Sequence, residues 1–176
     1  MKILHKFRNH KISPDTNILI IGTFNPDVQG NEADFFYGRS RNFLWSLLPK
    51  VFGEKSLKPS TLEEKQLFKR RYGIDFIDLI DEIEVEAGNE NNYADVFIDD
   101  KVTAWKDIIS VIKFNQNIRQ IYFTRKTFER IPYIRKKIKE IENFCKLKNI
   151  RFSCLPTPAR FENPKKLAEW KSIFGR

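Results

Sequence analysis

Four short apolar segments constrain the fold of this chain more than any other feature. They span residues 17–23, 74–80, 118–124 and 150–155, are rich in Ile and Phe, and end in turn-type residues. Segment 74–80 is the least regular, because Asp75 and Asp78 interrupt it. Patterns with helical spacing lie between these segments. Strands that alternate with helices predict a mostly parallel sheet in an α/β fold, with helices covering both faces.

The helical intervals carry recognisable local signals. Thr61 and Glu64 form a capping box ahead of Leu67 and Phe68. Asn163 and Pro164 are typical of the start of a helix. The remaining apolar stripes predict a helix over residues 43–51, one whose face includes Trp105, Ile108, Ile109 and Ile112, and one over residues 131–145.

Composition narrows the function classes. The 176 residues suit one compact domain, and a hydrophobic share of 41% can supply its core. No apolar run reaches the roughly 18 residues of a membrane span, and residues 1–14 lack an apolar signal segment, so we expect a cytoplasmic protein without a membrane partner. Cys145 and Cys154 lack metal-site spacing and predict reduced, structural thiols. His5 and His10 lie so near the N-terminus that a histidine deep in the fold is not expected.

Charge is distributed unevenly along the chain. Residues 1–74 carry a net charge of +6, residues 75–112 carry −9, and residues 113–176 carry +12. Such asymmetry is typical of a protein with one face for a polyanion, although solvated basic helices would give the same pattern.

Ligands of open parallel sheets bind beyond the carboxyl ends of the strands. Gly22 ends the first apolar segment and allows close approach of the backbone to a ligand. The stretch 35–45 then supplies aromatic rings that can stack on a base, an amide that can read its edge, and arginines that can hold phosphates. After the fourth segment, residues 155–161 form a proline-stiffened loop that could press into a duplex. Packing of these loops on the core is the alternative explanation.

Three motifs in order resemble the uracil-DNA glycosylase superfamily. They are a strand ending in G-T-F-N-P, then Y-G-R-S-R-N-F-L-W, and a late L-P-T-P-A-R before an N-P-K-K-L-A-E-W helix. The chain is most similar to the mismatch-specific and hypoxanthine-DNA glycosylase branches, and the resemblance covers most of residues 1–176. It implies one domain, a three-layer α/β/α sandwich with a central four-stranded mostly parallel sheet, and a monofunctional enzyme that needs no metal or cofactor and flips its base.

The resemblance also assigns residues. It implies that Asn42 and Asn25 are catalytic amides. Asn25 is the nearest match to the water-directing residue of the first motif, but lies one position further from Gly22 than usual, where Phe24 takes the expected place. The other implied roles are base binding by Gly22, Thr23, Phe24, Tyr37 and Phe43, and DNA binding by Arg39, Arg41, Thr157, Pro158, Ala159 and Arg160.

Two departures from the family pattern affect the expected activity. The late loop lacks the histidine of the most active uracil enzymes, and the first motif lacks their aspartate at its usual spacing. We therefore expect a slow enzyme, or one whose base leaves easily, acting on uracil or hypoxanthine in DNA as a monomer. A non-catalytic nucleic-acid-binding module of the same fold and a nucleoside-processing hydrolase remain the alternatives.

Overall fold

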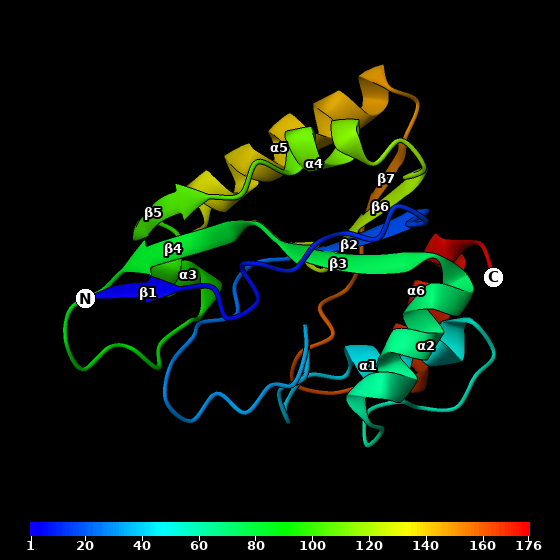
Figure 1. The fold of residues 1–176 in the computed structure, drawn as a ribbon, viewed down its shortest axis with the longest axis horizontal. Coiled ribbons are helices and arrows are strands. Elements are labelled where there is room, and N and C mark those ends of the chain that lie inside the picture. Colours follow the sequence, from blue (N-terminus) through cyan, green and yellow to red (C-terminus); the bar gives the residue numbers. More distant parts are fainter.

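The computed structural model describes residues 1–176 and is built around a four-stranded parallel sheet (Figure 1). The sheet has the order β3-β2-β6-β7. Its strands are β2 (Ile18–Gly22), β3 (Ile74–Asp78), β6 (Gln120–Phe123) and β7 (Arg151–Cys154), all paired in parallel. Each strand lies within one of the four apolar segments, so the predicted parallel sheet is confirmed.

Helices cover both faces of this sheet, because alternate side chains of each strand point to opposite sides. In β2, Leu19 and Ile21 join one apolar cluster, whereas Ile18 and Ile20 join the other. The first cluster packs beneath α4 (Ile108–Phe114) and α5 (Pro132–Leu147); the second packs against α1 (Leu44–Val51), α2 (Leu62–Tyr72) and α6 (Pro164–Phe174). The three-layer α/β/α arrangement is therefore confirmed.

The predicted helix starts act as expected. The Thr61 side chain accepts from the Glu64 backbone N–H, and the Glu64 carboxylate accepts from the Thr61 N–H, which completes the capping box of α2. Asn163 caps α6 by accepting from the Lys166 N–H at 2.8 Å. These local signals fix where each helix begins, and so where the preceding loop must end.

A second sheet, which sequence reasoning missed, lies beside the carboxyl end of β3. It is antiparallel, with the order β1-β4-β5, and consists of β1 (Lys2–Leu4), β4 (Ile80–Glu84) and β5 (Val102–Trp105). The predicted strand 74–80 thus divides at Leu79, and the chain passes from one sheet into the other. A one-turn helix, α3 (Asp95–Ile98), lies in the connection between β4 and β5.

The placement of Trp105 on a helix was wrong. Trp105 ends β5, where it pairs with Ile80. Helix α4 begins only after Asp107, whose side chain accepts from the Ser110 N–H at 3.0 Å. Strand pairing thus overrides helical periodicity at this residue, because the spacing from Trp105 to Ile108 fits a helix equally well.

Neither cysteine forms a disulfide. Burial, followed by the charge of Glu142, raises the pKa of both Cys145 and Cys154 to about 11, so each remains an unreactive thiol at neutral pH. Separately, none of the helices combines the length and apolar character that a membrane crossing requires.

Candidate active site

The carboxyl ends of β2 and β3 form the floor of the candidate site. Gly22 and Asp78 are direct partners in the parallel pairing of these strands. A Cβ atom at Gly22 would lie 2.2 Å from Asp78 Oδ1 and 2.6 Å from the Tyr37 hydroxyl. Only glycine therefore permits these two polar groups to approach the strand end together.

Tyr37 reaches this floor from the loop before α1. Its backbone has φ 58°, a left-handed conformation that turns the chain. The Thr124 hydroxyl donates to the Ile21 carbonyl at 3.3 Å, so the Tyr37 hydroxyl donates to Thr124 Oγ1 at 3.1 Å. Burial, followed by the negative charge of Asp78, raises the pKa of Tyr37 well above its ordinary value. Tyr37 therefore remains a neutral phenol fixed between two strand ends.

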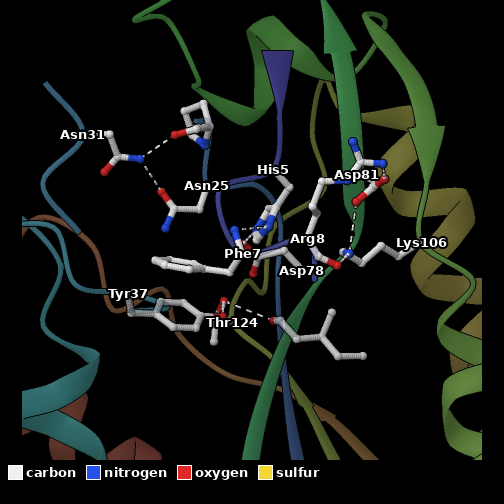
Figure 2. A network of polar contacts seen from close by, with 12 residues as sticks. His5, Phe7, Arg8, Asn25, Asn31, Tyr37, Asp78, Asp81, Lys106 and Thr124 are labelled. Carbon is white, nitrogen blue, oxygen red and sulfur yellow. Dashed lines mark hydrogen bonds and ion pairs between the residues drawn. The ribbon is translucent and has the colours of Figure 1, made fainter. Parts of the chain in front are cut away.

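A histidine lies deep in the fold, contrary to the expectation from its position in the sequence. His5 is 1% exposed, and its Nε2 lies 2.7 Å from Asp78 Oδ2. Its Nδ1 accepts from the Phe7 backbone N–H at 3.0 Å, which assigns the ring proton to Nε2 and makes it the donor to Asp78. Figure 2 shows this pair beside the Tyr37–Thr124 contact. The N-terminal segment is thus part of the site, because β1 pairs with β4 next to the end of β3.

A second acid approaches the same edge from α3. Asp95 is held by Arg125, with an Nη1–Oδ2 distance of 2.5 Å. Burial raises the pKa of Asp95, although the charge of Arg125 and a hydrogen bond from Thr23 act in the opposite direction. Its contact with Thr23 places it beside the loop that follows β2.

Asn25 is buried, and its amide oxygen is already occupied. Asn25 Oδ1 accepts from Asn31 Nδ2 at 2.8 Å (Figure 2). It also accepts from Arg39 Nη2 at 3.1 Å. Because the oxygen is held by two donors, the orientation of the amide is fixed, and the Nδ2 group is the part that remains to donate to a ligand. Two predicted site residues, Asn25 and Arg39, are thus in direct contact.

Asn42 occupies the start of α1, where its side chain also has a structural role. Asn42 Oδ1 accepts from the Leu44 N–H at 2.9 Å, which forms an Asx turn directly before the helix. Its backbone N–H donates to the Arg39 carbonyl at 2.9 Å. As in Asn25, the amide oxygen is engaged and the nitrogen is available.

The late loop, residues 155–161, pairs with the loop before α1. Asn42 and Ala159 form an isolated antiparallel bridge. The Phe43 N–H donates to the Pro158 carbonyl at 2.8 Å, and the Arg160 N–H donates to the Arg41 carbonyl at 2.9 Å. Thr157 and Arg160 are exposed, whereas Pro158 is buried. Segments more than 110 residues apart in the sequence therefore form one continuous surface.

The predicted aromatic base contacts are less open than expected. Lys58 Nζ lies 3.3 Å from the centroid of the Phe43 ring, so one face of that ring is covered. Phe24 packs with its ring centroid 5.9 Å from that of His5. Both rings are half-buried against the core, as the packing alternative described.

Sequence reasoning missed Asp78, His5, Thr124 and Asp95 as site residues. A signal existed for Asp78, since an acid that interrupts an apolar strand directly before the sheet edge requires a polar partner. Thr124, which ends the third apolar segment, was a weaker signal. Nothing in the sequence pairs His5 with residue 78. No group of three or more His, Cys, Asp or Glu side chains is arranged to hold a metal ion.

Comparison with known proteins finds a structural match. The chain resembles the solution NMR structure of a candidate uracil DNA glycosylase from Methanosarcina acetivorans, with a TM-score of 0.64 and 20% sequence identity. The match covers 93% of this chain and 91% of the other. At this identity the match establishes the fold. No family model and no curated protein sequence matches the chain.

Proposed function

We propose that this protein is a monofunctional DNA glycosylase that hydrolyses the N-glycosidic bond of a deaminated base, uracil or hypoxanthine. The observation that carries the proposal is the convergence of three loops at one sheet edge: the loop after β2, the loop before α1, and the late loop. The fold shared with the Methanosarcina protein supports it. The product would be an abasic site, the first intermediate of base-excision repair.

The hydrogen bonds within the site determine which side-chain groups remain free to donate to a base and which remain free to accept from it. Because the oxygens of Asn25 and Asn42 are engaged, both amides offer N–H groups. Deamination replaces an amino group on the base with a carbonyl, and an N–H donor favours the carbonyl. Asp78 Oδ1 accepts no hydrogen bond within the chain and is the free acceptor at the same edge. Such an acceptor can orient a water molecule or accept a ring N–H of the base.

Base release from labelled oligonucleotides tests the proposal. Duplexes and single strands with uracil or hypoxanthine, in pairs and in mismatches, are incubated with the protein and then cleaved with alkali. Strand scission at the damaged base is the expected result, and the panel identifies the preferred base. Scission at none of these bases would exclude the enzyme.

The two amides can be ranked by substitution. We expect Asn42→Ala to lower single-turnover base release by about 10²-fold or more, the effect of removing one positioned catalytic group, and Asn25→Ala to cost less. Unfolding measurements on both variants separate this effect from loss of the Asn42–Leu44 hydrogen bond, which costs about 1 kcal/mol. A larger loss in Asn25→Ala would make Asn25, the first-motif residue, the main catalytic amide. Unchanged base release in both variants would refute this site.

A non-catalytic DNA-binding module is the second candidate. It is favoured by the same amide oxygens, since neither is free to orient a water molecule. Salt-dependent binding to undamaged duplex without base release would support the module. We also propose that Arg160, in the late loop, acts as a wedge that fills the gap left by a flipped base. The same binding experiments test this role. As a wedge, Arg160→Ala should impair base flipping most opposite well-paired bases, whereas as a phosphate contact it should weaken binding to all DNA equally.

A further inference from the structure

A polar cavity of about 530 Å³ adjoins the candidate site. Its walls come from three segments: residues 28–33, residues 38–40, and the pair Asn91 and Tyr93. Arg39 belongs to both places, because it lines the cavity and donates to Asn25 Oδ1. A ligand in the cavity could therefore contact Arg39, which in turn contacts the proposed catalytic residue Asn25.

The Arg39 guanidinium is a cation without an acidic partner. It stacks on Tyr93, with its central carbon 3.6 Å from the ring centroid, and no carboxylate forms an ion pair with it. Glu32 lines the same cavity but is exposed and unpaired with Arg39. Burial lowers the pKa of Arg39, while the charges of Tyr93 and Asp78 act in the opposite direction. A half-buried cation of this kind favours an anion at its free edge.

The backbone of the cavity wall adds further donors. The main-chain N–H groups of Gln29, Gly30 and Glu32 donate no hydrogen bond within the chain. Gly30 has φ +83°, and the space around its Cβ position is open. Unpaired N–H groups in a cavity wall that also includes a guanidinium can donate to a tetrahedral oxyanion.

We propose that this cavity binds one phosphate of the DNA strand beside the target nucleotide. Arg39 is the ligand, and Tyr93 is a positioning residue that holds the guanidinium flat. The proposal rests on the proposed function only in naming DNA as the source of the phosphate. A contact fixed to one linkage would set the register of the strand, so that one nucleotide faces the site.

A scan of neutral linkages tests the contact. Oligonucleotides with a single methylphosphonate at successive positions around uracil are bound to the full chain, and their dissociation constants are measured before any base is released. We expect one position to weaken binding by about tenfold or more, because a hydrogen bond to a charged group is lost there. In Arg39→Gln that position should become indistinguishable from its neighbours. Arg70→Gln, which removes an equally charged but remote and exposed side chain of α2, should keep the position dependence.

Two substitutions test whether Tyr93 positions the Arg39 guanidinium. Tyr93→Phe retains the ring and should keep the position dependence, whereas Tyr93→Ala should weaken it. A flat profile in the unmodified protein, or the same sensitive linkage in Arg39→Gln, would overturn the proposal. Inorganic phosphate that binds the cavity while neutral linkages have no effect would also overturn it, since the source would then be free phosphate. Binding is measured separately from hydrolysis. A protein that releases no base but binds less tightly when one particular linkage is neutral would therefore refute the proposed activity and support the phosphate contact.

Discussion

Two aspartate–histidine pairs lie three residues apart on strand β3, and they differ in how completely they are satisfied. Asp75 pairs with His10 at 2.8 Å, and Asp78 pairs with His5 at 2.7 Å. Asp75 also accepts from Lys69 Nζ at 2.7 Å and from the Ser13 N–H at 3.0 Å. Asp78 has no partner besides His5.

The difference separates a fully hydrogen-bonded carboxylate from one with an oxygen open to a ligand. Asp75 is 1% exposed, and its oxygens are surrounded by donors that attach the N-terminal segment to the sheet and to α2. Asp78 is also buried as a residue, at 5% exposed, yet its Oδ1 faces Gly22 and Tyr37 and accepts no hydrogen bond from the chain. This oxygen is not among the fully buried atoms that lack a partner, so it remains accessible to a ligand at the sheet edge.

The largest effect is expected from removing the charge of Asp75. Asp75→Asn leaves the Lys69 ammonium, whose side chain is 7% exposed, without its carboxylate. Breaking a buried ion pair from one side costs about 3–5 kcal/mol, so the free energy of unfolding in urea should fall by that amount. A loss below about 1 kcal/mol would mean that Asp75 does not stabilise the fold more than Asp78 does.

Asp78→Asn should have the opposite profile. We expect base release to fall by about 10²-fold or more, because the free acceptor is lost from the reacting edge. Stability should change less than in Asp75→Asn, since no buried cation loses its partner. Single-turnover rates and urea midpoints measured on the same preparations test this, and equal rate losses in the two folded variants would contradict it.

The histidines should follow their partners with smaller effects. His5→Gln removes the donor that fixes Asp78 and should lower base release by about tenfold, which is the effect of one weakened hydrogen bond. His10→Gln should leave the rate unchanged and lower stability by about 1 kcal/mol. An unchanged rate of base release in His5→Gln would leave His5 as a packing residue.

The smallest expected effect is on acid denaturation, and it concerns Asp75. Burial alone would raise the pKa of Asp75, but the hydrogen bond from His10 and the charge of Lys69 outweigh it, and the pKa lies below its ordinary 3.8. Asp75 therefore contributes stability that is present above about pH 4 and is lost as the pH falls below that value. Asp95, whose pKa is raised, acts in the opposite direction. Urea midpoints measured from pH 6 to pH 3 should fall less steeply in Asp75→Asn, and parallel curves would contradict the assignment.

The sequence by itself determined the layered fold. The apolar runs are continuous because parallel strands are buried on both faces, and the capping residues Thr61 and Asn163 act through neighbours three positions away. These are local effects that a linear pattern records. The same reading expected the loops that contain Gly22, Tyr37 and Arg160 at the carboxyl ends of the strands, and these loops contact one another in the structure.

Only the tertiary structure decided which polar groups meet at that edge. His5 reaches Asp78 across 73 positions because β1 joins a second sheet, and that sheet exists because the chain changes partners at Leu79. Asn25 and Asn42 look alike in the sequence, yet their oxygens are taken by Arg39 and by a helix start. Hydrogen bonds between distant segments depend on orientation in space, and periodicity along a chain does not encode orientation. The four-stranded parallel core could therefore be read from the sequence, whereas the second sheet and the assignment of donors and acceptors in the site required three dimensions.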